Sequence, residues 1–213
     1  TYITGDATIY GNLNGHTLEV SGNLTVNSSV DIAEGDITVG KDLYNYGNIS
    51  LSGGYLTVNG NYNAYEATTN KDGTITYSNG GYLYMNNAVD KVTINGDFNT
   101  CADYYYYHDS CLKLGTIEIK GNLNDYYNTN SKYYGLSSYG TKFIFSGTGR
   151  QTITATDGYI YFKNVDFVDT ENRELVVNCE ISADLCRDTY ITGDATIYGN
   201  LNGHTLEVSG NLT

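Results

Sequence analysis

Residues Leu18 to Leu24 read LEVSGNL, and the same arrangement returns along the chain. Apolar and polar residues alternate, Gly-Asn or Gly-Asp follows, and an apolar residue comes next. The alternation predicts a strand with one face in the core, and the Gly-Asn or Gly-Asp pair predicts a turn, because both residue types tolerate positive φ. The further copies are ITVGKDL (Ile37–Leu43), LTVNGNY (Leu56–Tyr62), VTINGDF (Val92–Phe98), IEIKGNL (Ile117–Leu123) and the partial copy FIFSGTG (Phe143–Gly149).

The motif recurs with a short period of about 19 residues, a spacing typical of solenoid repeats. The anchor glycines, or the residues in their place, are Gly5, Gly22, Lys41, Gly60, Gly80, Gly96, Gly121, Gly147, Asn164 and Cys179. The sequence therefore predicts an all-β, single-chain β-solenoid (a parallel β-helix) of about ten rungs per repeat, which rises on the order of 50 Å. Stacked corner residues are expected to form a side-chain ladder, made of Asn23, Asp42, Asn61, Asp97 and Asn122.

A longer repeat encloses the short one. Thr1–Thr25 reads TYITGDATIYGNLNGHTLEVSGNLT, and Thr189–Thr213 reads the same, an offset of 188 residues. Packing requires only buried and turn positions to agree, yet exposed-type residues such as His16 and His204 also match. We interpret residues 1–188 as one complete repeat module and residues 189–213 as the start of the next identical module, continuous with the solenoid. An engineered duplication is the alternative.

Composition and charge narrow the possible partners. The chain has 25 Gly, 23 Tyr and no Pro or Trp, a mixture that favours strands and turns. The competing fold, a pair of immunoglobulin-like sandwiches, fits the composition but not the short period. A net charge of −13 argues against a nucleic-acid partner, because phosphate binding needs clustered basic residues. The same negative charge suits an extracellular surface. No stretch of the sequence is apolar enough for membrane insertion. We expect any sorting signal to lie outside these residues.

Two tyrosine-rich insertions interrupt the short period. One holds CADYYYYHDSC (Cys101–Cys111), and the next holds DYYNTNSKYYGLSSYG (Asp125–Gly140). Insertions in a solenoid emerge as loops on one face, and adjacent rungs place these two beside each other. Tyrosine offers broad, rigid contact area with a polar tip, which suits a host glycan or matrix protein; the alternative is that the rings only cover the solenoid. The candidate ligand-binding residues are Tyr104, Tyr105, Tyr106, Tyr107, His108, Tyr126, Tyr127, Tyr133 and Tyr134.

A third tyrosine-containing stretch lies at residues 63–81 and reads NAYEATTNKDGTITYSNGG. Its polar composition breaks the motif between two regular copies. We interpret it as one irregular rung of the solenoid.

The four cysteines are Cys101, Cys111, Cys179 and Cys186, which allow three disulfide pairings. Local pairing of 101 with 111 and of 179 with 186 closes two short loops. Neither spacing is that of a zinc CxxC pair, so in an exported protein disulfides are expected, whereas in the cytosol the thiols would stay reduced.

No catalytic, metal or cofactor site is predicted. Asp166, Asp169 and Glu171 are calcium candidates by charge alone, and solvated turn carboxylates are the simpler interpretation. Parallel β-helices also serve as polysaccharide lyases and hydrolases, which need clustered carboxylates on one face. No carboxylate pair recurs at rung spacing in this sequence, so an enzyme is not expected.

Several phrases resemble the repeat units of large exported bacterial surface proteins, in which β-solenoid modules recur in tandem. They are GNLNGHTLEVSGNLTV, GGYLTVNGNYNA, GYLYMNNAVDKVTINGDFNT, LGTIEIKGNL and FIFSGTGRQTI, and the resemblance covers roughly residues 7–167. It implies an adhesin-like, secreted, cell-surface protein in which the module is a structural stalk that projects an adhesive region. The neighbouring modules of the same chain are the expected partners. The alternatives are a multivalent cell-adhesion module that binds through its Tyr-rich loops, and a β-helix enzyme acting on polysaccharide.

Overall fold

The computed structural model describes residues 1–11, 16–102, 111–127, 136–138, 140–148, 151–162, 165–167, 178–185, 189–192, 194–197, 205–208 and 210–213. Side chains are described for the same residues except 137, 138 and 155–195. Within these ranges every regular element is a β-strand and no helix occurs. The strands form three sheets, which we call A, B and C.

The strand bounds follow the repeated motif. Sheet A contains β1 (Tyr2–Ile3), β3 (Leu18–Val20), β6 (Asp36–Val39), β9 (Tyr55–Val58), β13 (Lys91–Ile94), β15 (Thr116–Ile119), β18 (Lys142–Phe145), β20 (Val165–Phe167), β22 (Thr189–Thr192) and β24 (Leu206–Val208). Sheet B contains β2 (Ala7–Ile9), β4 (Leu24–Val26), β7 (Leu43–Asn45), β10 (Tyr62–Thr69), β14 (Phe98–Thr100), β16 (Leu123–Asp125), β19 (Gln151–Phe162), β21 (Asn178–Leu185) and β23 (Asp194–Ile197), with β11 (Ile75–Asn79) and β17 (Ser137–Ser138) attached. Sheet C contains β5 (Ser29–Asp31), β8 (Asn48–Ser50) and β12 (Tyr82–Tyr84).

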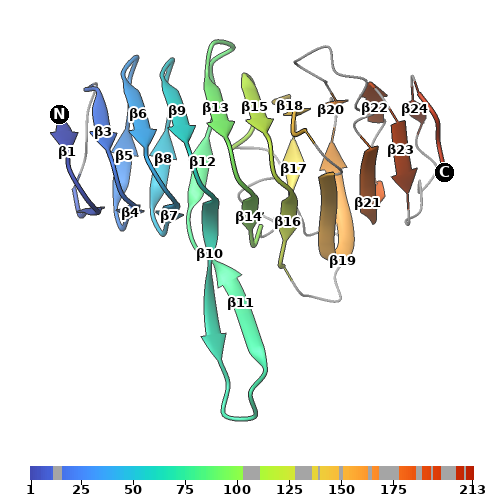
Figure 1. The fold of residues 1–213 in the computed structure, drawn as a ribbon, viewed down its shortest axis with the longest axis horizontal. Helices are drawn as coiled ribbons and strands as arrows, with labels where there is room; N and C mark the ends of the chain where they lie inside the picture. Colours follow the sequence, from blue (N-terminus) through green and yellow to red (C-terminus); the bar gives the residue numbers. More distant parts are fainter. Residues whose placement is uncertain are drawn as a thin grey trace.

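The chain visits the sheets in a fixed order and stacks each visit on the previous one (Figure 1). We call one complete turn of the chain, from one strand of sheet A to the next strand of sheet A, a level. Neighbouring levels pair in parallel throughout, and the antiparallel pair β10–β11 is the exception among the described strands. The immunoglobulin-like alternative is wrong, because its sheets are antiparallel sandwiches.

The predicted number of rungs is too high. Eight strands of sheet A, from β1 to β20, precede β22, where the sequence starts to repeat. Register partners in sheet A lie 19 residues apart from Leu18 to Ile37 and from Ile37 to Leu56, but 36 apart from Leu56 to Val92. Gly80 belongs to that single long level, and Cys179 lies within β21 of sheet B, so neither begins a level of its own. Eight levels rise about 38 Å at ~4.8 Å each, less than predicted.

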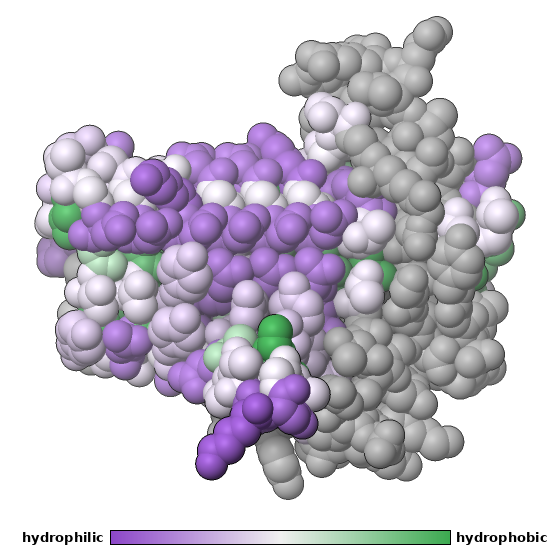
Figure 2. Space-filling view, turned by 60° about the horizontal axis from the view of Figure 1, so that its bottom comes forward, coloured by the Kyte–Doolittle hydropathy of each residue, from purple (hydrophilic) through white to green (hydrophobic). Residues whose placement is uncertain are grey.

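The core is built from columns of apolar side chains that face inward from each sheet. Period-two alternation puts the side chains of one face of every strand inside, and the parallel register then stacks each apolar side chain on the equivalent one of the neighbouring level. Sheet A supplies the columns Leu18, Ile37, Leu56, Val92, Ile117, Phe143 and Val20, Val39, Val58, Ile94, Ile119, Phe145; sheet B supplies Leu24, Leu43, Tyr62, Phe98, Leu123, Ile153; all are buried. Figure 2 shows the complementary outer surface, where hydrophilic side chains run in rows along the molecule.

The Asx residues at the corner between sheets A and B form a continuous hydrogen-bonded ladder. In each level the backbone N–H of the Asx residue donates to the side-chain Oδ1 of the Asx residue one level back. The donors and acceptors are Asn23 to Asp6 (2.7 Å), Asp42 to Asn23 (3.1 Å), Asn61 to Asp42 (2.7 Å), Asp97 to Asn61 (2.8 Å) and Asn122 to Asp97 (2.7 Å). The predicted ladder is confirmed in its position, although its bonds join side chains to backbone.

A glycine precedes most ladder residues because a side chain there would collide with the ladder. A Cβ on Gly60 would lie 2.2 Å from Asp42 Oδ1, and one on Gly96 would lie 2.4 Å from Asn61 Oδ1. Among the described anchor glycines, Gly5 alone has a positive φ, of 100°. The expectation that these corners need positive φ is therefore wrong at the other anchors.

Candidate functional site

Most of the predicted ligand-binding residues lie outside the described part of the chain. These are Tyr104, Tyr105, Tyr106, Tyr107, His108, Tyr133 and Tyr134. Tyr126 and Tyr127 are described, directly after β16, and both are half-buried. The site can therefore be built upward from Tyr126 and from the bases of the two insertions.

Tyr126 belongs to a cluster of three rings that come from three segments. Tyr65 lies on β10 and Tyr77 on β11. The rings of Tyr77 and Tyr126 stack with centroids 4.6 Å apart and planes 16° apart. The Tyr65 ring meets both edge-on, at 5.6 Å from Tyr77 and 5.0 Å from Tyr126. Such geometries are the favourable ones for aromatic pairs, so the cluster fixes the hairpin against the sheet.

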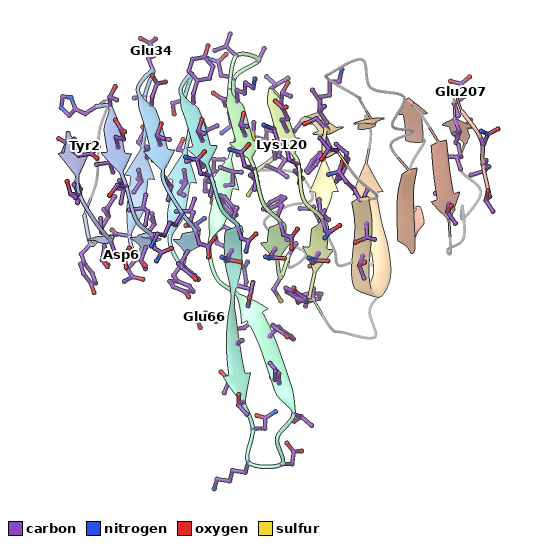
Figure 3. The ribbon with its side chains drawn as sticks, in the orientation of Figure 1. Tyr2, Asp6, Glu34, Glu66, Lys120 and Glu207 are labelled. Carbon is purple, nitrogen blue, oxygen red and sulfur yellow. The ribbon has the colours of Figure 1, made fainter. Side chains whose placement is uncertain are left out.

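The hairpin β10–β11 leaves sheet B and projects beyond the other strands (Figure 1), with Glu66 near the point of departure (Figure 3). The prediction that residues 63–81 form an irregular rung is wrong, because β11 pairs antiparallel with β10 and the chain returns to the same level through β12. The turn holds Asp72-Gly73, with Gly73 at a φ of 83°. An Asp-Gly pair between alternating strands is a strong hairpin signal, and it was present in the sequence.

The two faces of the hairpin differ in character. Residues that pair directly across an antiparallel ladder share a face. One face carries the pairs Tyr65–Asn79, Ala67–Tyr77 and Thr69–Ile75, and the other carries Glu66–Ser78 and Thr68–Thr76. The first, which we call the tyrosine face, is the one on which the ring cluster lies. Near the tip, Ile75 is 54 % exposed on this face.

Stacked amides on the outside of sheet B hold Tyr126 in place. Asn99 Nδ2 donates to Asn63 Oδ1 at 2.9 Å, and Asn124 Nδ2 donates to Asn99 Oδ1 at 2.8 Å. The Tyr126 hydroxyl donates to Asn99 Oδ1 at 3.4 Å. The column of outward-facing asparagines on sheet B is thus hydrogen-bonded to Tyr126, the ring against which the hairpin packs.

The hydroxyls of Tyr65 and Tyr126 stay protonated over a wide pH range. Burial, followed by the neighbouring Tyr77 and Tyr46, raises the pKa of Tyr65. Burial, followed by Tyr65, Tyr77 and Asp97, raises the pKa of Tyr126. Burial also raises the pKa of Tyr44, with a further contribution from Asp42. These tyrosines are therefore neutral hydrogen-bond donors at physiological pH.

A single buried carboxylate organises the bases of both insertions. Asp125 Oδ1 accepts the backbone N–H groups of Ala102 (3.0 Å) and Tyr127 (3.2 Å), and Asp125 Oδ2 accepts that of Leu136 (2.7 Å). Ala102 lies at the start of the first insertion, while Tyr127 and Leu136 lie within the second. The expectation that the insertions emerge beside each other is confirmed at their bases. Sequence analysis missed Asp125 because its pattern position is that of an ordinary inward-facing residue.

The cysteine side chains at the ends of the first insertion are both buried. The backbone carbonyl of Cys111 accepts the N–H of Met85 at 2.7 Å, which attaches the end of the insertion to sheet C. A Cys101–Cys111 disulfide stays a prediction. Cys179 lies in β21, opposite Gln151 and Ala195, and Cys186 falls outside the described residues.

Of the three calcium candidates, Asp166 alone belongs to the described part of the chain. Asp166 lies in β20, paired with Ile144 and Thr192, while Asp169 and Glu171 fall outside the description. Across the described ranges, no three His, Cys, Asp or Glu side chains gather in a way that would hold a metal ion. The same ranges contain no helix long and apolar enough to cross a membrane.

Comparison with known proteins gives no relative. No protein-family model, no curated protein and no solved structure matches the chain.

Proposed function

We propose that this chain is a β-solenoid repeat module of an exported surface protein, most simply a bacterial one, and that tandem modules form an extended, non-enzymatic stalk. One observation carries the proposal. The copied segment continues the sheets of the module before it, so that successive modules can stack without a linker.

The two copies of the repeated segment pair in the same way. In the first copy Tyr2 pairs with Glu19, and in the second Tyr190 pairs with Glu207. In addition, β22 pairs in parallel with β20, and β23 pairs with β21. Since β1 has the sequence of Tyr190 and Ile191 within β22, a preceding module would meet β1 through its own β20.

Stacked levels suit a stalk because each level contacts only its neighbours. Length then changes by whole modules without redesign of the core. A net charge of −13 keeps such an array soluble and self-repelling. The resemblance of the repeat phrases to bacterial surface proteins adds the location, at the cell surface and exposed to the medium.

The length of tandem arrays tests the stalk. Chains with one, two and three copies of the 188-residue unit would be compared by small-angle scattering and electron microscopy. A continuous solenoid predicts a rod whose length grows linearly by about 38 Å per unit, or eight levels of ~4.8 Å. Growth with the square root of the number of units, or beads joined by bends, would show separate domains on linkers and end the stalk proposal. On intact cells, parent proteins with fewer modules would be compared by immunogold labelling, which measures how far the region beyond the array lies from the cell surface.

A second candidate function is multivalent adhesion through the tyrosine-rich insertions. Its support is the shared carboxylate of Asp125, which ties the bases of both insertions together and makes one composite surface the simplest outcome. Repetition would then raise weak binding through avidity. A panel of glycans and host-matrix proteins, probed with the parent and with Tyr104–Tyr107 changed to Ser, tests it. Equal binding by both proteins would remove these residues from the adhesive surface.

A further inference from the structure

The side-chain amide of Asn79 is an unexplained feature of the tyrosine face. Both its Nδ2 and its Oδ1 are buried, and neither has a hydrogen-bond partner among the residues that the structure describes. A buried amide without partners is costly, since its donor and acceptor lose their bonds to water. Native proteins keep such groups rarely, and each one calls for a physical reason.

Asn79 stands at the ring cluster. It pairs directly with Tyr65 across the hairpin and lies two residues from Tyr77 on the same face of β11. The Tyr77 ring stacks on that of Tyr126, so the amide is bordered by the cluster that fixes the hairpin to sheet B. Within the described residues, β11 is held by pairing to β10 alone.

The chemistry of this face selects the kind of ligand. An amide with an unused donor and an unused acceptor matches a hydroxyl group, which is itself a donor and an acceptor. Tyrosine rings offer flat apolar faces, and their protonated hydroxyls offer further hydrogen bonds. The chain carries a net charge of −13, so the field around it is negative on balance. That field disfavours an anionic ligand.

We propose that the tyrosine face of the hairpin, with Asn79 at its base, binds a neutral sugar ring. The apolar face of a pyranose lies against the Tyr126 ring, in the place that the Tyr77 ring leaves, and one of its hydroxyls bonds to the amide of Asn79. Because both amide atoms are shielded from solvent, binding requires a ring to turn aside, most simply Tyr77 on the lightly held β11. The site shares Tyr126 with the second insertion but takes Tyr77 and Asn79 from the hairpin, and it does not depend on the stalk proposal.

The test is a titration of the whole chain with neutral oligosaccharides (gluco-, manno-, galacto- and chito-), beside sialylated and sulfated glycans and a peptide library. We expect binding of at least one neutral sugar, with NMR shifts at the Tyr77 and Tyr126 rings. Asn79→Ala and Tyr126→Ser should weaken binding about tenfold or more, the effect of losing a central contact. Tyr55→Ser is the matched control, since Tyr55 is 49 % exposed on sheet A, and it should bind as the parent does.

Asn79→Ala separates a ligand role from a structural one. Removal of an unpartnered buried amide should raise the melting temperature while sugar affinity falls. A lower melting temperature would show that the amide has a structural partner, and would overturn the proposal. Equal sugar affinity in this variant, binding only of anionic glycans or peptides, or no binding of any neutral sugar with hairpin NMR signals intact would overturn it too. Loss of binding in the Tyr104–Tyr107 Ser variant alone would assign the sugar to the insertion.

Discussion

At the corner between sheets A and B, glycine is required at positions 22, 60, 96 and 121, because a side chain there would have no room. The ladder oxygen of the preceding level occupies the place where its Cβ would stand, as at Gly60 beside Asp42 Oδ1. Lys41 is the natural exception, and the ladder bond next to it, from Asp42 N to Asn23 Oδ1, is the longest of the corner bonds at 3.1 Å. The Gly-Asx pair was visible in the sequence, but its reason was not. The sequence of a single level does not show that a side-chain oxygen of the neighbouring level occupies the place of the glycine Cβ.

Gly60→Ala tests this explanation. The added methyl must displace Asp42 Oδ1 or the backbone of residue 41, so the variant should lose about 2–3 kcal/mol of unfolding free energy. Gly11→Ala is the control, since a Cβ there meets nothing within 4 Å, and it should lie within about 0.5 kcal/mol of the parent. Urea unfolding of both variants measures the difference. Equal stability would mean that the corner glycine serves another purpose.

From Asp6 to Asn122 the ladder also alternates between Asp and Asn, in the order Asp6, Asn23, Asp42, Asn61, Asp97, Asn122, and the next donor along the corner is the backbone N–H of Thr152. Either residue supplies the accepting oxygen, so hydrogen bonding does not require alternation. Electrostatics does, because two carboxylates on adjacent levels would lie about 4.8 Å apart. The alternation doubles that spacing.

Asn61→Asp should therefore change how stability depends on pH. In the parent, the backbone N–H of Asn23 lowers the pKa of Asp6, so this bond stabilises the fold above the unfolded pKa and is lost as the pH falls through the folded one. In the variant, three successive carboxylates repel, which raises their folded pKa values. The destabilisation should be present at neutral pH and should disappear as the pH falls below about 4, where the carboxyls are protonated.

Urea unfolding across this pH range measures the effect. Asn59→Asp adds the same charge two residues away and outside the ladder, where Asn95 Nδ2 donates to the side chain of residue 59, and it should lack the acid recovery. A variant at position 61 that is no less stable than the parent at neutral pH would show that the alternation has no electrostatic role.

Among the elements, the strands of sheets A and B were predictable from their alternation, because a half-buried strand has period two. The hairpin β10–β11 was not recognised, because its length is close to one rung and counting by period absorbed it. The Asp72-Gly73 pair between alternating residues was a stronger indication of a hairpin than the 19-residue period was of a further rung. The same error hid Tyr65 and Tyr77, while Tyr126 was included because it follows a motif copy. Which rings meet depends on where the hairpin folds back, and no sequence period contains that information.

Asp125 connects the backbone at Ala102, Tyr127 and Leu136, so its removal should destabilise all three segments. Asp125→Ala leaves three backbone N–H groups without their acceptor, two of them on the buried residues Ala102 and Leu136, so the fold should lose about 3 kcal/mol or more. Asp125→Asn keeps one accepting oxygen and should lose about half as much. Thermal unfolding measures stability, and limited proteolysis followed by mass spectrometry measures exposure of the insertions.

The proteolysis pattern distinguishes a shared anchor from a local one. Cleavage of Asp125→Ala should increase in both insertions together, at residues 103–110 and at 128–135. An increase in the second insertion alone would show that Ala102 does not depend on this carboxylate.

For the whole molecule, the identical ends predicted continuity, and the pairing of β22 with β20 agrees with it. The number of levels was predicted poorly, since insertions and a hairpin lengthen a level without adding one. Level count is a property of the register, which forms between residues up to 36 apart in sheet A, whereas a sequence period reports local spacing. The rise of the stack is accordingly shorter than the sequence suggested.

Continuity makes a strong prediction for circular permutation. Because residues 189–213 copy residues 1–25, the chains 1–188 and 26–213 contain the same 188 residues in permuted order. The first keeps the β3–β6 contact and lacks β20–β22, and the second does the reverse, so each retains seven contacts between neighbouring strands of sheet A. In a stack with nearest-neighbour energetics their unfolding free energies should agree within about 1–2 kcal/mol. Hydrogen exchange should protect the amides of β22, which lies between β20 and β24 in the second chain, as strongly as those of β3, which lies between β1 and β6 in the first. If the copied segment exchanged freely while the rest of the chain 26–213 stayed protected, the fold would stop at β20, and a tandem array would be a row of separate domains instead of one rod.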